Sequence, residues 1–125
     1  MIDKKIEVEK TDIAERTFAY ARTIIQCYRG IHKDEVGKIL GRQLLRAGTS
    51  VGENVEEAQA AQSKADFISK ISIAYKEARE ALYWLRLIRD EVSISQTEMD
   101  HALDEAEQLV KILSTILLSS KQNPY

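Results

Sequence analysis

Glu98 and His101 form the Glu-x-x-His spacing that metal-binding helical bundles use. In di-iron bundles, two helices each contribute such a motif, and two further helices each contribute a glutamate that points inward. The second histidine, His32, falls in a predicted loop and has no acidic residue three positions before it. One motif alone does not supply enough ligands, so the sequence predicts no metal site and no cofactor.

Glu77 and Glu80 share one side of a predicted helix, where two carboxyl groups could act as general acid and base. No histidine or nucleophile accompanies them on that side. Cys27, the only cysteine, has no activating context close in sequence and is predicted to be a small buried side chain. The sequence therefore predicts that the protein is not an enzyme, and it favours interface carboxylates at positions 77 and 80.

One segment carries four of the five glycines: Gly37, Gly41, Gly48 and Gly52. A phosphate-binding loop needs a lysine and a hydroxyl after its second glycine, whereas Glu53 and Asn54 follow here, and a carboxylate repels phosphate. Because glycine costs a helix about 1 kcal/mol relative to alanine, we predict that a second helix approaches closely at these positions. Asn54 is interpreted as a hydrogen-bonding residue that fixes register inside a bundle.

The helices that position these residues are predicted from apolar periodicity and capping residues. We expect helices over residues 12–29, 34–62, 63–91 and 95–120, with residues 1–10 and 121–125 as frayed tails. The predicted N-terminal caps are Asp12 with Glu15, Asp34, Ser63 with Asp66, and Ser95 with Glu98. Connections of a few residues force consecutive helices to lie antiparallel. The predicted fold class is all-α, an antiparallel up-down-up-down four-helix bundle that forms a single domain over residues 1–125.

Each predicted helix has an apolar stripe that should face the core. The stripes of the second, third and fourth helices include Leu44, Leu85 and Leu109, respectively. For the first helix, the spacing predicts a stripe of Ala14, Phe18, Ala21, Ile25 and Tyr28.

Composition and charge exclude several classes of protein. With 44% hydrophobic and 30% charged residues, the chain is typical of globular domains, not of disordered ones. The longest apolar run, from Ile112 to Leu118, is too short to span a bilayer, and the first residues lack the apolar core of a signal peptide. A lone cysteine suits a reducing compartment. We therefore expect a cytoplasmic protein without a membrane partner.

The third helix has apolar residues on two sides. Ile73, Trp84 and Leu87 lie opposite its core stripe, interleaved with Glu77 and Glu80. The second helix likewise places Ile39, Arg42, Arg46, Ser50, Glu53 and Glu57 opposite its own stripe. Exposed apolar groups beside ordered charges are typical of an interface.

From this second side we predict a homo-oligomer in which Arg42 or Arg46 of one subunit meets Glu77 or Glu80 of another. The predicted interface residues are Arg42, Arg46, Ile73, Glu77, Glu80, Trp84 and Leu87. The alternative is a set of solvated surface ion pairs worth under about 1 kcal/mol, with Trp84 lying flat on the surface.

Two motifs resemble those of a bacterial four-helix-bundle family, the 23S rRNA-intervening sequence proteins. The run from Arg46 to Ala58 is similar to the family pattern Arg-Ala-x-Ser-Ile/Val followed by Asn-Ile-Ala-Glu-Gly, with Ala58 in place of the last glycine. Residues 73–85 resemble the motif of the family's third helix, and the likeness covers about residues 18–118. The positions that match the family pattern are Arg46, Ser50, Asn54, Glu57, Glu77 and Glu80.

The resemblance implies an antiparallel four-helix bundle that forms ring-shaped homopentamers and whose biochemical role is undetermined. It also implies a link to ribosomal RNA, suspected from gene location. A related group assists the reverse transcriptases of diversity-generating retroelements by binding the enzyme and nucleic acid.

Two functional hypotheses follow. The first is a non-enzymatic, homo-oligomeric scaffold or adaptor that presents its surface to another macromolecule. The second is an accessory protein that binds RNA or DNA, although a net charge of −2 gives little of the phosphate attraction that such binding needs. The candidate nucleic-acid contacts come from the two quarters of the chain with an excess of positive charge: Arg16, Arg22, Lys70, Arg79, Arg86 and Arg89.

Overall fold

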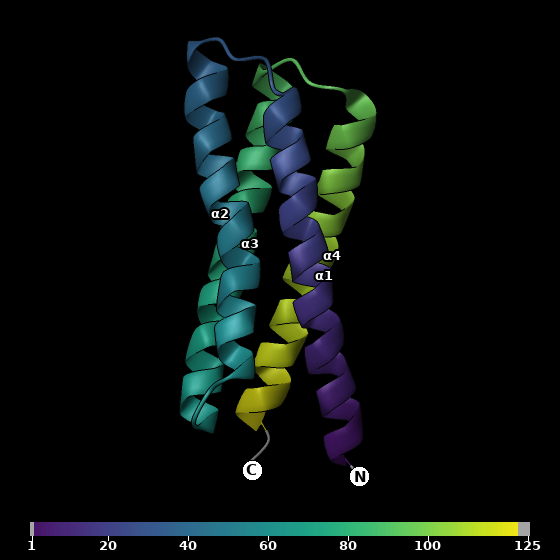
Figure 1. Cartoon of the computed structure of the whole chain (residues 1–125), viewed down its shortest axis with the longest axis vertical. Coiled ribbons are helices and arrows are strands. Elements are labelled where there is room, and N and C mark those ends of the chain that lie inside the picture. The colour runs from purple at the N-terminus through teal and green to yellow at the C-terminus, as the bar shows by residue number, and fades with distance from the viewer. Residues whose placement is uncertain (1, 123–125) are drawn as a thin grey trace.

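Four long helices make up the protein in its computed structural model, which describes the backbone of residues 2–122 and the side chains of residues 13–122. They are α1 (Ile2–Gly30), α2 (Glu35–Gln59), α3 (Lys64–Glu91) and α4 (Gln96–Gln122). Consecutive helices run in opposite directions, and α1 begins at the end of the bundle where α4 finishes (Figure 1). Each helix packs against two neighbours, α2 against α3 most extensively and α1 against α4 least. The predicted four-helix, all-α fold is confirmed.

Two of the predicted caps start their helices as expected. The Asp34 carboxylate accepts a hydrogen bond from the Gly37 amide at 2.8 Å, and the Ser63 hydroxyl accepts one from the Asp66 amide at 3.0 Å. These bonds satisfy amide groups that have no partner within the first turn of a helix.

The ends of three helices differ from the prediction. α1 begins at Ile2, so Asp12 lies within the helix and cannot cap it. The physical reason is that residues 2–11 contain no glycine or proline and are rich in lysine and glutamate, which favour helix. α2 ends at Gln59, three residues before the predicted end at 62, because residues 60–63 reverse the chain into α3. α4 continues to Gln122, two residues beyond the predicted end, and residues 123–125 of the predicted tail lie outside the described part.

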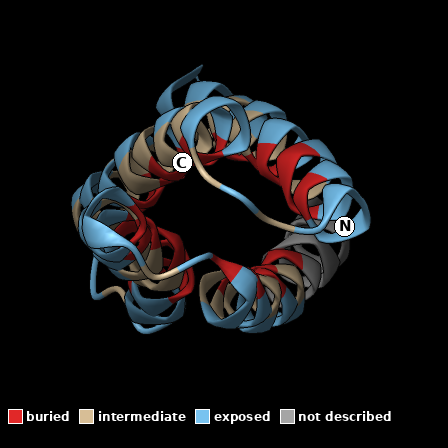
Figure 2. Ribbon diagram, turned by 90° about the horizontal axis from the view of Figure 1, so that it is seen from above, coloured by how far each residue is buried: buried red, intermediate tan, exposed pale blue. Residues whose placement is uncertain are grey.

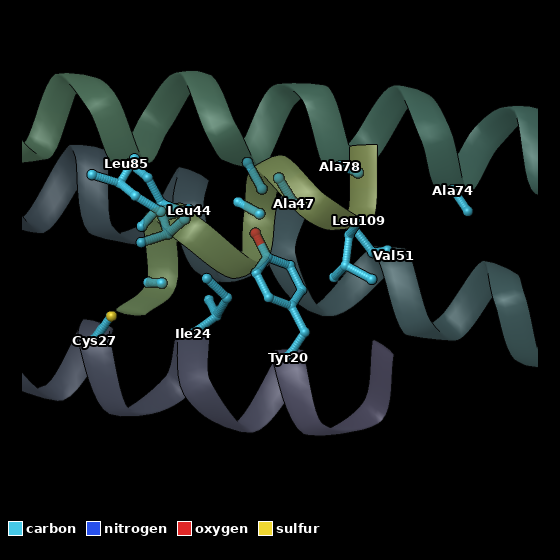
Figure 3. Close-up of a cluster of buried hydrophobic side chains, with 14 of the residues drawn as sticks. Tyr20, Ile24, Cys27, Leu44, Ala47, Val51, Ala74, Ala78, Leu85 and Leu109 are labelled. Carbon is cyan, nitrogen blue, oxygen red and sulfur yellow. The ribbon is translucent and has the colours of Figure 1, made fainter. Parts of the chain in front are cut away.

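The core lies along the axis of the bundle, where the buried side of every helix faces inward (Figure 2). Large side chains such as Ile24, Leu44, Leu85 and Leu109 interdigitate there with small ones, and several of them are seen together in Figure 3. The small residues of the core are Ala47, Ala58, Ala74, Ala78, Ala81, Ala102 and Ala106. Burying each leucine or isoleucine contributes about 1.5–3 kcal/mol to folding.

The predicted core stripe of the first helix is wrong. Phe18, at its centre, is 63% exposed, whereas Tyr20 and Ile24 are buried. The two stripes differ by about one residue, or 100° around the helix. The true stripe includes Thr17, whose buried hydroxyl donates to the Ile13 carbonyl at 2.8 Å. Because that bond satisfies the hydroxyl within its own helix, a polar residue can face the core.

The glycines of α2 allow α1 to approach closely, as predicted. A β-carbon at Gly48 would lie 2.7 Å from the Ile24 side chain, and one at Gly52 would lie 3.2 Å from the Thr17 carbonyl oxygen. Gly41 similarly faces the Tyr28 ring, at 3.1 Å. Gly37 differs, because it faces the His32 carbonyl of the connecting loop. We call the line of Gly41, Gly48 and Gly52 the glycine seam.

Burial of the Cys27 thiol makes the stability of the fold depend on pH in the alkaline range. The thiol lies 3.7 Å from the Glu98 carbonyl oxygen, and its burial, with the nearby Glu98 carboxylate, raises the pKa of Cys27 from 9.0 to about 11. Between about pH 9 and pH 11 the unfolded chain releases this proton while the folded chain keeps it. We therefore expect the free energy of unfolding to be unaffected by this group below about pH 9 and to fall as the pH rises towards 11.

Urea denaturation across this pH range measures the effect, with Cys27→Ala as the comparison. The variant should lose stability less steeply with pH than the parent protein. Equal slopes in the two proteins would contradict the assignment to the thiol.

Candidate oligomer interface

Four of the six family-pattern residues lie on the outer side of the two most extensively packed helices, α2 and α3, which lie side by side in Figure 1. They are Arg46, Ser50, Glu77 and Glu80. We define the α2/α3 face by the residues Val36, Ile39, Arg42, Arg46 and Ser50 of α2 and Ile73, Glu77, Glu80, Trp84 and Leu87 of α3. On both helices these positions lie away from the core stripe.

Arg46 holds the centre of the face by bridging from α2 to α3. Its guanidinium donates to Glu77 Oε2 at 3.2 Å and also to Glu80 Oε1, within a single chain. Glu80 Oε1 further accepts a hydrogen bond from the Trp84 indole at 3.4 Å. One cluster of charges thus joins the two helices and orients the tryptophan.

This geometry corrects the predicted pairing of Arg46 with the glutamates of another subunit. The antiparallel register of α2 and α3 brings Arg46 level with both Glu77 and Glu80, so its own chain already supplies its partners. Arg42, one turn earlier, is exposed, and the described part of the structure gives it no such partner. For Arg46, the structure thus has a contact within the chain in place of the predicted contact between subunits.

Arg46 and Glu80 favour each other's charged state. The hydrogen bond from Arg46 is the main cause that lowers the pKa of Glu80, and the bond to Glu80 raises the pKa of Arg46. Side-chain exposures of 50% for Arg46 and 32% for Glu80 leave the pair largely screened by water. Its contribution to stability is accordingly under about 1 kcal/mol.

Apolar side chains surround this cluster. Ile39 is 53% exposed, Val36 49% and Ile73 40%, while Trp84 and Leu87 are half-buried. The ion pair aligns Arg46 with Glu80, and because the two helices are antiparallel, Ile39 lies level with Leu87. Both α2 and α3 therefore contribute to the apolar part of the α2/α3 face. Val36 was not among the predicted interface residues, although its position one turn before Ile39 was a signal for it.

Ser50 and Asn54 bond to the backbone of their own helix. The Ser50 hydroxyl donates to the Arg46 carbonyl at 2.7 Å, and the Asn54 amide donates to the Ser50 carbonyl at 2.9 Å. The expected register-fixing role of Asn54 is therefore not met by this bond, which links no second helix. The polar group can be buried because a carbonyl four residues earlier accepts from it. The last family-pattern residue, Glu57, lies 3.6 Å from Lys70 of α3 in an exposed ion pair.

The six basic residues predicted to contact nucleic acid do not gather on one side. Arg16 and Arg22 lie on α1, whereas Lys70, Arg79, Arg86 and Arg89 lie on α3, which is not a neighbour of α1 in the bundle. Arg16 bonds to Glu105 at 2.7 Å, Lys70 pairs with Glu57, and Arg89 pairs with Asp90 at 2.9 Å. Carboxylates thus neutralise half of the predicted set.

The residues weighed for metal chemistry are also dispersed. Within the part of the chain that the structure describes, no three histidine, cysteine, aspartate or glutamate side chains come together to hold a metal ion. His32 and His101 are both exposed and lie on different elements. Over the same residues, none of the helices combines the length and apolar character that crossing a membrane requires.

Comparison with known proteins shows a family and related solved structures. The family described as "23S rRNA-intervening sequence protein" matches residues 9–115. A crystal structure of a protein of unknown function, from the S23 ribosomal protein family of Bacteroides thetaiotaomicron, is 33% identical and superposes with a TM-score of 0.78. The match covers 88% of this chain and 98% of the other. No curated protein matches.

Proposed function

This chain belongs to the family of 23S rRNA-intervening sequence proteins, and from that premise we propose that it is a non-enzymatic building block of a homo-oligomer. The observation that carries the proposal is the α2/α3 face, on which exposed Ile39 and Ile73 flank the ordered cluster of Arg46, Glu77 and Glu80. An exposed apolar patch beside ordered charges is typical of a subunit contact.

The oriented Trp84 strengthens this proposal. Its indole N–H is already bonded to Glu80, and its ring meets Tyr83 edge-on, with 5.0 Å between the ring centroids. An aromatic side chain held in place loses little conformational freedom on binding, so its contact area adds to affinity at low cost.

The cytoplasmic location predicted from the sequence is kept as part of the same proposal.

The charges of the face support a role without catalysis. A carboxyl group that transfers protons near neutral pH needs a pKa raised towards 7. The pKa of Glu80 is instead lowered, because Arg46 donates to it. In the proposed assembly these carboxylates keep their ion pairs and position the apolar residues around them.

We propose five subunits, the ring size that the family resemblance implies. A closed ring larger than a dimer joins subunits head to tail, so the α2/α3 face must meet a different surface of the next subunit. Arg46 can then contribute to the contact without a carboxylate from another copy, since Glu77 and Glu80 of its own chain already accept its hydrogen bonds. The ring itself would present a repeated surface to another macromolecule, which is the scaffold role.

Oligomeric state in solution tests the proposal directly. We expect multi-angle light scattering of the parent protein to give the mass of five chains of 14.2 kDa each. Ile39→Lys and Ile73→Lys place a charge in the proposed contact, where burial without a partner costs several kcal/mol, so each should raise the dissociation constant at least about tenfold.

Leu118→Lys is the matched control, because Leu118 is an aliphatic side chain that is 57% exposed and lies on α4. It should assemble like the parent protein. A monomeric parent at about 100 μM, well above the dissociation constants of stable oligomers, would refute the proposal. Equal dissociation in all three variants would place the contact elsewhere.

The nucleic-acid hypothesis has weaker support, because the basic residues are divided between α1 and α3 and are partly neutralised. Salt-sensitive retention of RNA by the assembled protein would revive it.

A further inference from the structure

Phe18 has the greatest exposed fraction, 63%, among the large apolar side chains that the structure describes. It lies on α1 at the centre of a stripe formed with Ala14, Ala21 and Ile25, all three of which are only half-buried. Their spacing of four, three and four residues places them along one side of the helix. An apolar stripe that faces outward on a soluble bundle calls for a partner.

A shallow depression borders this stripe where α1 meets the last turn of α2. It has a volume of about 380 Å³, and its lining consists of Ala14, Glu15, Phe18, Glu56 and Gln59. We call this depression, together with the stripe, the α1/α2 groove. It lies outside the α2/α3 face, since α1 and α3 are separated by the other helices of the bundle.

The glycine seam explains why the groove exists. Contact of Gly48 with Ile24 and of Gly52 with Thr17 fixes the rotation of α1 against α2. In that rotation the inward positions are taken, so Phe18 cannot turn into the core without opening the seam. The groove is therefore built into the helix packing and does not depend on a movable loop.

The rim of the groove is negatively charged. Glu15 and Glu56 are both exposed, and neither forms an ion pair within the described residues. The last turn of α2, which carries Glu56, contains no basic residue to offset the negative end of the helix dipole. Arg22 follows Phe18 by one turn, towards the opposite end of the stripe.

We propose that the α1/α2 groove binds a basic amphipathic helix of another protein. An apolar stripe between two helices accepts the apolar side of a third helix, in the mode in which residues spaced by three and four anchor a peptide. Leucine-like anchors would pack on Phe18 and Ile25, and flanking lysine or arginine residues would pair with Glu15 and Glu56. The same carboxylates disfavour nucleic acid and anionic lipid. This binding site goes beyond the proposed assembly and does not require it.

Fluorescence anisotropy with a designed peptide tests the proposal. The probe is a labelled 18-residue helix with leucines on one side and lysines at its borders, compared with peptides that carry glutamate in place of lysine or serine in place of leucine. We expect only the leucine–lysine peptide to bind the full-length protein. Phe18→Ala and Glu56→Lys should each weaken that binding at least tenfold.

Glu107→Lys is the control that separates binding in the groove from attraction by overall charge. It makes the same charge change on α4, at an exposed position, and should leave the affinity within twofold. Circular dichroism should show unchanged helicity in every variant, because all three replaced side chains are exposed. Equal loss in Glu107→Lys, or binding of the serine–lysine peptide, would mean attraction by overall charge and would overturn the proposal. Dissociation of the protein's own oligomer by Phe18→Ala would mean that a second copy fills the groove, which overturns it as well.

Discussion

Replacing Gly48 with alanine should destabilise the protein, although alanine favours helix over glycine by about 1 kcal/mol. The new β-carbon would lie 2.7 and 2.8 Å from the γ-carbons of Ile24 and 3.1 Å from its β-carbon. Ile24 is fully buried, so it cannot move aside without disturbing the core. Overpacking of this kind costs about 1–3 kcal/mol, and we expect the midpoint of urea denaturation to fall accordingly.

A double-mutant cycle with Ile24→Ala isolates the cause. Ile24→Ala alone should cost about 2–5 kcal/mol, because it leaves a cavity in the core. In that background both γ-carbons are gone and only the β-carbon of residue 24 remains, 3.1 Å away, so Gly48→Ala should become neutral or stabilising by up to about 1 kcal/mol. This reversal of sign is the signature of direct contact across the glycine seam.

Gly30→Ala is the matched control for the same chemical change. A β-carbon there would approach only the end of the Glu98 side chain, which is exposed and can move. The control should therefore be close to neutral. If Gly48→Ala stabilised the parent protein, α1 and α2 would not be in the close contact described above.

The sequence was sufficient to predict the helices and three of the four core stripes. In α2, α3 and α4 the apolar residues of the core stripe recur with a clear helical period, and no second apolar stripe of equal size competes with them. These stripes contain Leu44, Leu85 and Leu109, respectively. The glycines gave an additional signal, since their spacing indicated the close approach that the structure contains.

The rotation of α1 could not be predicted in the same way. Two apolar stripes lie side by side on that helix, and the stripe containing Phe18 has fewer polar residues than the one containing Thr17 and Tyr20. The choice between them depends on contacts with α2, where Thr17 meets Gly52 and Ile24 meets Gly48. Such a choice is made by tertiary packing, so periodicity within one helix does not reveal it.

The candidate site was predictable in its chemistry but not in its connectivity. The sequence predicted that Arg42 or Arg46 would meet Glu77 or Glu80 of another subunit, and in the structure Arg46 meets both glutamates of its own chain. Whether the pairing joins two chains or two helices of one chain depends on the register between α2 and α3. A difference of one helical turn, about 5.4 Å, would have left Arg46 free for another subunit.

The hydroxyl of Tyr20 should reduce stability, so that Tyr20→Phe is more stable than the parent protein. The side chain is 1% exposed and projects from α1 into the core (Figure 3), and its oxygen has no hydrogen-bond partner within the described structure. Burial also raises the pKa of Tyr20, and the neighbouring Cys27 and Glu105 add to this effect. An unpaired buried hydroxyl costs about 1–3 kcal/mol, which phenylalanine removes while keeping the ring.

Tyr20→Ala supplies the opposite arm of this test. It removes the ring as well as the hydroxyl and leaves a cavity in the core, so a loss of about 3–5 kcal/mol is expected. The two variants together separate the ring, which stabilises the core, from the oxygen, which does not. Thermal unfolding followed by circular dichroism should therefore rank phenylalanine above tyrosine and tyrosine above alanine. If phenylalanine ranked below tyrosine, a buried water would be bonded to the hydroxyl, and the oxygen would contribute to the stability of the core.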